Sequence, residues 1–324
     1  MIEEEIRPQD IFDEYLKLCE QDVIDYFGQA TYRMVACPAC NNRGQFAFHK
    51  KGFNYDECKK CHTLFVNPRP DKESFERYYQ DAPSTKYWAT TFYKKTEAAR
   101  REKMWVPKAG LIQEILKQNS SPELLVDIGA GYGIFADVTR ELYETRLLLV
   151  EPSNHLSEIC REKGFEVLQK TLEELTKEDV PSCYKCFVCF ELFEHLHDPG
   201  YFLERLNTIM QSGDIFVFTT LSGTGIDIQV LWEEAKAVSP PHHLNFFNPW
   251  SVKKLVEAHG FSDVKVQTPG KLDINILESS LDKFEDRFLK TFLHFANENC
   301  KAKFQELLSS HCFSSHMMVS CKKE

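Results

Sequence analysis

Short apolar runs recur along the second half of the chain, and stretches with helical spacing lie between them. We interpret these runs as strands, at residues 124–128, 146–150, 186–190, 215–219, 264–266 and 317–321. Strands that alternate with helices are typical of a parallel sheet with crossover helices. The pattern therefore predicts an α/β domain over residues 121–324, with a helical insertion at 272–310.

The first 120 residues follow a different pattern. Apolar residues three and four positions apart predict an N-terminal helical segment over residues 1–35. A cysteine-containing module bounded by prolines follows at 36–66. Residues 67–120 alternate charged with aromatic side chains, which indicates helices that link the module to the α/β domain and cover the substrate.

Composition places the chain among ordinary globular proteins, since 43% of its 324 residues are hydrophobic and 27% are charged. The 49 acidic and 39 basic residues give a formal net charge of −10, which argues against a uniformly basic nucleic-acid binder. No apolar run approaches the roughly 20 residues of a membrane helix, and the N-terminus lacks the layout of a signal peptide. We therefore expect a cytoplasmic protein with no membrane partner, and the pattern leaves its oligomeric state open.

Four of the twelve cysteines form two tight pairs, Cys37-Pro-Ala-Cys40 and Cys58-Lys-Lys-Cys61, with seventeen residues between them. This double spacing is typical of a zinc site, because two turns can present four sulfurs to one ion. All four positions of the tetrahedron are then filled, so we predict a structural Zn²⁺. The alternative is a group of four core cysteines without a ligand.

A glycine-rich loop, Asp127-Ile-Gly129-Ala130-Gly131-Tyr-Gly133, follows the first strand and precedes a helix. Glu151 ends the next strand, where a carboxylate can accept hydrogen bonds from two ribose hydroxyls. The glycine spacing is close to a dinucleotide fingerprint, so NAD is one interpretation. Asp127 favours S-adenosylmethionine instead. A carboxylate attracts the ammonium and the sulfonium of that cofactor, whereas it would repel the diphosphate of NAD.

Two groups of acidic and imidazole side chains follow the strands predicted at 186–190 and 215–219. Glu191, Glu194 and His195 come directly after residues 186–190, and we expect Glu191 and His195 to share one face of a helix start. His195 is then a candidate general base, because a neutral imidazole suits proton transfer near neutral pH. A second candidate is His243, which follows His242 and a pair of prolines. The alternative for these histidines is capping or packing.

The segments 126–133, 150–153 and 191–199 resemble three motifs of class I S-adenosylmethionine-dependent methyltransferases. The resemblance implies a seven-stranded, doubly wound (Rossmann-like) sheet. In that family the glycine loop holds the methionine part of the cofactor, an acid binds the ribose, and residues near 170–172 flank the adenine. Carried over residue by residue, the implied cofactor contacts are Asp127, Gly129, Ala130, Gly131, Glu151, Pro152, Thr171, Leu172 and Glu191.

The cysteine module, followed by Val66-Asn-Pro-Arg-Pro-Asp71 and a tyrosine-rich stretch, resembles the N-terminal part of zinc-containing sugar C-methyltransferases. That resemblance implies a small polar acceptor, a sugar or a nucleotide-linked sugar. In those enzymes a glutamate–histidine pair stands where this chain has His242 and His243. His243 matches the catalytic histidine, whereas His242 replaces the glutamate.

A rival interpretation uses the same residues as metal ligands. Glu-x-x-Glu-His with a downstream histidine resembles the magnesium site of plant small-RNA 2′-O-methyltransferases, and its first part resembles O-methyltransferases of ubiquinone synthesis. Glu191, Glu194, His195 and His243 would then bind a second divalent ion and polarise a hydroxyl of RNA or of a small molecule. Two further hypotheses remain. The protein could be an enzyme that acts on nucleic acid and binds RNA through the lysines of its cysteine module, or a non-catalytic module that keeps the fold and binds partners.

Overall fold

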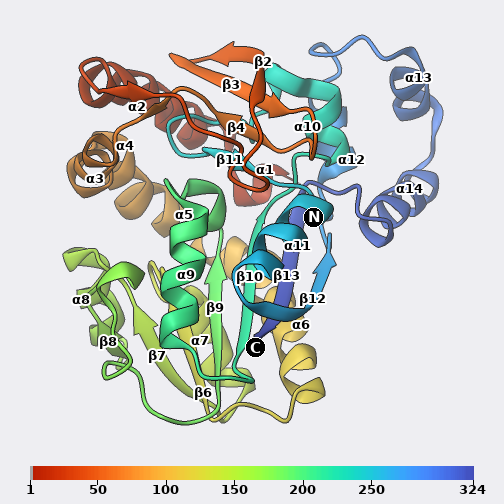
Figure 1. The fold of residues 1–324 in the computed structure, drawn as a ribbon. Coiled ribbons are helices and arrows are strands. Elements are labelled where there is room, and N and C mark those ends of the chain that lie inside the picture. Colours follow the sequence, from red (N-terminus) through yellow and green to blue (C-terminus); the bar gives the residue numbers. More distant parts are fainter. Residues whose placement is uncertain (1–2) are drawn as a thin grey trace.

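Over residues 3–324, which the computed structural model describes, the largest element is a seven-stranded sheet (Figure 1). Its order is β12-β13-β10-β9-β6-β7-β8, and only β13 runs antiparallel to its neighbours. The strands are β6 (Leu124–Ile128), β7 (Arg146–Val150), β8 (Glu166–Leu168), β9 (Lys185–Phe190), β10 (Ile215–Leu221), β12 (Phe261–Gln267) and β13 (His316–Lys323). The predicted α/β sheet is confirmed, and β8 is the strand that the apolar pattern missed, because it is short and half-exposed at the edge.

Helices cover both faces of this sheet, which gives the sheet two buried cores. Residues of α9 and α11 pack on one face, and residues of α6 and α7 pack on the other. The helices of this part are α6 (Val106–Gln118), α7 (Ile134–Leu142), α8 (Asn154–Glu162), α9 (Pro199–Ile209), α10 (Ile226–Leu231) and α11 (Pro249–Ala258), with short 3-10 turns η3 (Leu172–Glu174), η4 (Phe193–His195) and η5 (Trp232–Glu234). Nearly continuous apolar strands such as β9, which is apolar after its first residue Lys185, are expected when both faces are buried.

The cysteine module forms a second sheet in the described part of the chain, with the order β11-β4-β3-β2. Its strands are β2 (Gly44–Lys50), β3 (Phe53–Cys58), β4 (Leu64–Val66) and β11 (Asn245–Phe246). β11 comes from the α/β half of the chain, and Asn245 pairs with Phe65 of β4. The module is therefore joined to the α/β half by backbone hydrogen bonds as well as by side-chain packing. Nearby, β1 (Tyr32–Arg33) pairs with β5 (Arg69–Pro70).

Most of the remaining helices lie around the module (Figure 1). Before β6 lie α1 (Glu3–Ile6), α2 (Gln9–Phe27), α3 (Lys72–Asp81), α4 (Pro83–Tyr87), the π-helical turn η1 (Trp88–Phe92), α5 (Tyr93–Arg100) and the π-helical turn η2 (Arg101–Trp105). The predicted insertion folds as α12 (Asp273–Glu278), α13 (Arg287–Phe295) and α14 (Glu298–Ser310), which share a core with β2, β3 and α10. None of the helices between residues 3 and 324 combines the length and the apolar character needed to cross a bilayer.

Candidate active site and metal centre

The glycine loop joins β6 to α7 at the carboxyl edge of the large sheet. Gly129, Gly131 and Gly133 have φ angles of 74°, 55° and 68°, a region that residues with a Cβ rarely adopt. A Cβ added at Gly131 would meet no atom within 4 Å, whereas one at Gly133 would approach the Cys160 sulfur at 3.1 Å. The loop therefore turns sharply and leaves open space beside Gly131, as the approach of a ligand to the backbone requires.

Two buried carboxyl groups flank this loop. Asp127 is 2% exposed, and its Oδ2 atom has no hydrogen-bond partner within residues 3–324. Burial and then the charge of Glu151 raise the pKa of Asp127 to about 7. Glu151 accepts hydrogen bonds from the backbone N–H groups of Gly131 at 2.8 Å and Ser153 at 2.9 Å. An unpartnered buried carboxyl is costly, and a cationic ammonium beside it removes that cost, so these residues fit S-adenosylmethionine.

The other predicted cofactor contacts lie around the same edge in different environments. Ala130 is half-buried within the loop, and Pro152 is exposed directly after β7. Thr171 caps the turn η3 and donates its backbone N–H to Glu174 at 2.7 Å. Leu172 is 3% exposed and its side chain belongs to the core. Leu172 can therefore border an adenine only through its backbone.

Glu191 forms an ion pair with Lys108, a residue that the sequence analysis did not identify. It follows β9 with a φ of 51°, and its Oε1 atom lies 2.8 Å from the Lys108 ammonium and accepts from the Thr219 hydroxyl at 2.8 Å. Lys108 is 6% exposed and also lies over the Trp105 ring. Burial acts to raise the pKa of Glu191, but Lys108, together with His316 and the two hydrogen bonds, lowers it.

The expectation that Glu191 and His195 share a helix face is wrong. The segment after β9 is a single 3-10 turn, η4, and the positive φ of Glu191 directs the chain away before the turn begins. Of the four metal ligands that the rival interpretation names, the described structure groups Glu194, His195 and His243, whose ligand atoms all lie within 4.8 Å of one another. Glu191 is not in this group, because its carboxylate is held by Lys108 and Thr219.

The Glu194–His195–His243 cluster is formed by segments that are about fifty residues apart in the chain. Glu194 is 1% exposed and accepts from the Thr220 hydroxyl at 2.8 Å, and burial, followed by the charge of Glu191, raises its pKa to about 8. The ring centroids of His195 and His243 are 4.9 Å apart. His243 Nδ1 lies 2.5 Å from the Ala237 carbonyl oxygen, to which it donates. In a neutral imidazole this assignment leaves Nε2 as an acceptor.

His242, by contrast, points into a buried aromatic group. Its Nε2 atom lies 2.6 Å from the Tyr78 hydroxyl and 3.5 Å from the Cys19 sulfur, and its ring stacks on Tyr15. Burial, and to a smaller extent His243, lowers the pKa of His242 to about 3. His242 is thus a neutral packing residue that fixes the backbone of its neighbour, while Tyr79 places its hydroxyl 3.4 Å from His195 Nδ1.

Lys108, Thr219 and Thr220 are functional candidates that the sequence analysis missed. The two threonines are fully buried at the carboxyl end of β10, where they hold Glu191 and Glu194 in place. Their signal in the sequence is a pair of hydroxyl residues that ends an otherwise apolar strand. Lys108 gave no comparable signal, because one lysine in a helical segment is ordinarily a surface residue.

The four predicted zinc ligands come together at the two turns of the module. The sulfurs of Cys37 and Cys61, and those of Cys40 and Cys58, are each 3.5 Å apart, and all four lie within 4.8 Å of one another. A tetrahedral ion with Zn–S bonds of about 2.3 Å requires sulfur separations of about 3.8 Å. The sulfur-only donor set and its spacing fit a structural zinc ion.

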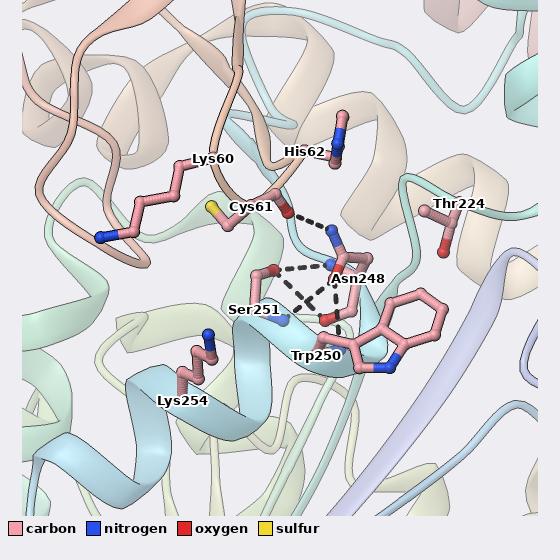
Figure 2. Close-up of a pocket in the computed structure, with 8 residues that line it drawn as sticks. All are labelled: Lys60, Cys61, His62, Thr224, Asn248, Trp250, Ser251 and Lys254. Carbon is pink, nitrogen blue, oxygen red and sulfur yellow. Dashed lines mark hydrogen bonds between the residues drawn. The ribbon is translucent and has the colours of Figure 1, made fainter.

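A hydrogen bond connects this cysteine cluster to the α/β half. Asn248 caps α11 by accepting from the backbone N–H groups of Trp250 and Ser251, and its amide donates to the Cys61 carbonyl oxygen at 2.6 Å (Figure 2). A cavity of about 260 Å³ lies beside this contact, with Lys60, His62 and Lys254 around it. The module is therefore anchored at the turn that contains Cys61, and loss of this turn would disturb α11.

Comparison with known proteins agrees with this geometry. A family model described as a methyltransferase domain matches residues 100–266, which is just over half of the chain. No curated protein matches the sequence. Among solved structures, phosphoethanolamine N-methyltransferase 2 of Haemonchus contortus in complex with S-adenosyl-L-methionine is 16% identical, with a TM-score of 0.51. The match covers 80% of this chain and 62% of that one.

The same Haemonchus contortus enzyme in complex with phosphomonomethylethanolamine and S-adenosylhomocysteine is 17% identical, with a TM-score of 0.50 and the same shares of the two chains. A SAM-dependent methyltransferase of Archaeoglobus fulgidus is 18% identical, with 71% of this chain and 100% of that chain covered and a TM-score of 0.47. The chain thus belongs to the methyltransferase domain family, as a class I S-adenosylmethionine-dependent methyltransferase.

Proposed function

We propose that this methyltransferase transfers a methyl group to a small polar acceptor and that His243, supported by His195, removes the proton of the acceptor. The pairing of the two imidazoles carries the proposal. His243 Nε2 is left as an acceptor because Nδ1 donates to Ala237, and the His195 ring lies 4.9 Å away. A positioned base contributes to methyl transfer when the acceptor loses a proton on reaction.

S-adenosylmethionine supplies the electrophilic methyl group when it is bound. In our proposal Asp127 holds the ammonium, the backbone at Gly129, Ala130 and Gly131 accommodates the methionine part, and Glu151 holds the ribose. Pro152, Thr171 and the backbone of Leu172 border the adenine side. Glu191, fixed by Lys108, contributes negative charge near the sulfonium instead of acting as a base. Its low pKa supports this role, because the carboxylate stays ionised.

The acceptor class that the sequence resemblance favours is a sugar, either free or nucleotide-linked. The departure from the sugar enzymes at His242 is compatible with this class, because the His242 Nε2 atom is engaged by Tyr78, whereas the His243 ring lies closer to His195, with ring centroids 4.9 Å apart against 6.0 Å for His242. The aromatic helices between residues 67 and 120 pack over the glycine loop, since Tyr93 stacks on Tyr132 with ring centroids 5.3 Å apart. We propose that this segment covers the acceptor.

The test measures transfer of labelled methyl groups to a panel of sugars, sugar nucleotides and other small hydroxylated molecules. His243→Ala should lower turnover by about 10²-fold or more, as for other general bases, while S-adenosylhomocysteine binds as in the wild type. His294→Ala, which removes an exposed histidine on α13, is the matched control. Unchanged turnover in His243→Ala would refute the proposed base.

The metal-dependent alternative has one observation in its favour, the grouping of Glu194, His195 and His243 within 4.8 Å. In that mechanism a divalent ion polarises a hydroxyl of the acceptor. Metal analysis separates the two mechanisms, because the base mechanism expects one zinc ion per chain, held by the four cysteines. A second ion that disappears in Glu194→Gln but not in Cys61→Ser would establish the metal-dependent mechanism.

A further inference from the structure

A cavity lies between the turn that contains Cys61 and the first turn of α11, and none of the residues that line it belongs to the cofactor site or to the histidine pair (Figure 2). Its volume is about 260 Å³, close to the lower end of the range of about 300–1,000 Å³ that small-molecule sites have. Cys61 and Asn248, which both line it, are 187 residues apart in the chain. The cavity is therefore formed by the tertiary structure, and it has room for one small ligand.

The buried residues of this cavity already bind each other and form a fixed inner wall. Asn248 is 2% exposed, and its Oδ1 atom accepts from the backbone N–H groups of Trp250 and Ser251 at 3.1 Å and 2.9 Å. The Ser251 hydroxyl in turn accepts from the Asn248 backbone N–H at 2.9 Å. The N–H groups at the start of α11 are thus satisfied within the protein, so recognition of a ligand falls to the exposed residues around the cavity.

The exposed rim of the cavity is positively charged, and none of the lining residues in the described chain has a carboxylate. Lys60 and Lys254 are both exposed, and neither ammonium group has a hydrogen bond or an ion pair within residues 3–324. His62 also lines the cavity, and its Nδ1 atom lies 3.0 Å from the Glu57 carboxylate. Two unpaired ammonium groups at one cavity attract an anion, and lysine is a common partner of phosphate.

Trp250 adds an exposed aromatic surface to this rim. It is 61% exposed, although tryptophan is mostly buried in folded proteins, and no aromatic ring between residues 3 and 324 stacks on it. Figure 2 shows Trp250 and Thr224 on one side of Asn248 and the two lysines on the other side. A ligand that fills the cavity therefore meets an indole ring at one end and ammonium groups at the other.

We propose that this cavity binds a mononucleotide, with its base on the Trp250 ring and its phosphate between Lys60 and Lys254. A nucleobase is planar and stacks on an indole, and the phosphate is attracted by both ammonium groups. A longer RNA strand agrees less well with the structure, because the cavity is small and the net charge of −10 opposes the binding of a polyanion. The site is separate from the cofactor loop, so the proposal goes beyond the proposed function and does not depend on it.

The test uses the full chain saturated with S-adenosylhomocysteine, which blocks the cofactor site, and measures the binding of adenosine 5′-monophosphate by calorimetry at constant ionic strength. Trp250→Ala should weaken this binding about tenfold or more and change the binding of inorganic phosphate less than twofold. Lys254→Met should weaken the binding of both compounds at least threefold. Both substitutions lie on α11 and leave the cysteine turns unchanged. The matched controls are Lys253→Met, at an exposed lysine of the same helix, and Tyr201→Ala, at an exposed aromatic residue of α9.

Equal nucleotide affinity in all variants, or no binding to the wild type, would overturn the inference. Adenosine and inorganic phosphate are also measured separately, because the proposal expects the nucleotide to bind at least tenfold more tightly than either part. A single-stranded oligonucleotide is the last probe: if it binds and the mononucleotide does not, the surface serves RNA and the proposal is wrong. None of these measurements needs turnover, so failure of the base test on His243 leaves this proposal standing.

Discussion

The buried carboxyl of Asp127 should make the cofactor-free protein less stable as the pH rises. Its pKa is raised from 3.8 to about 7, so the folded state holds the proton more tightly than the unfolded chain does. The contribution of this carboxyl group to the free energy of unfolding is therefore fully present below about pH 4 and is lost as the pH rises towards 7. Because one pKa unit corresponds to 1.36 kcal/mol, ionisation of Asp127 lowers the free energy of unfolding by about 2.5 kcal/mol between pH 5 and pH 8.

Asp127→Asn removes this ionisation without changing the shape of the side chain. Relative to the wild type, the variant should gain about 2.5 kcal/mol in unfolding free energy between pH 5 and pH 8, measured by urea denaturation of cofactor-free protein. It should also bind S-adenosylhomocysteine about 10- to 100-fold more weakly, because a charge-assisted hydrogen bond to the ammonium is worth about 1.5–3 kcal/mol.

Comparison at two pH values cancels the other titrating groups, which the two proteins share. Asp282→Asn, at an exposed carboxylate before α13, is the control. If the difference in unfolding free energy between Asp127→Asn and the wild type is the same at pH 5 and pH 8, the carboxyl is not held protonated by burial. If the variant also binds S-adenosylhomocysteine as tightly as the wild type, Asp127 does not serve as the ammonium partner.

Three other predictions address the remaining parts of the molecule. Glu151→Ala should weaken S-adenosylhomocysteine binding at least tenfold in calorimetry while the urea midpoint changes little; equal binding would remove the role in ribose recognition. Chelation of zinc should raise hydrogen exchange over residues 37–61, and reloading with Co²⁺ should restore both protection and the wild-type rate; a rate that depends on which metal is bound would contradict a structural role. Lys185→Met should cost about 3–5 kcal/mol in unfolding free energy, because Lys185 and Asp214 are 3.3 Å apart with side chains 2% exposed. Addition of Asp214→Asn should recover part of that loss, and no recovery would show that the pair is not coupled.

Local features of the sequence determined much of the fold and of the cofactor site. Apolar runs placed six of the seven strands, most clearly the central strands β6, β9 and β10, which are buried on both faces and contain few polar residues. The positive φ angles at Gly129, Gly131 and Gly133 follow from the residue type, and the parallel sheet then places Asp127 and Glu151 at one edge. The double cysteine spacing likewise predicted the cluster of four sulfurs, since each pair lies within one turn.

Only the tertiary structure decided how the charged and imidazole side chains pair. Lys108 meets Glu191 across 83 residues of chain, His195 meets His243 across 48, and β11 joins the cysteine module to the α/β half through β4. Such contacts depend on which helices and strands pack together, and periodicity along the chain does not encode that choice. The wrong placement of Glu191 on a helix face with His195 has the same origin, because Glu191 pairs with the distant Lys108 and lies outside the turn that contains His195.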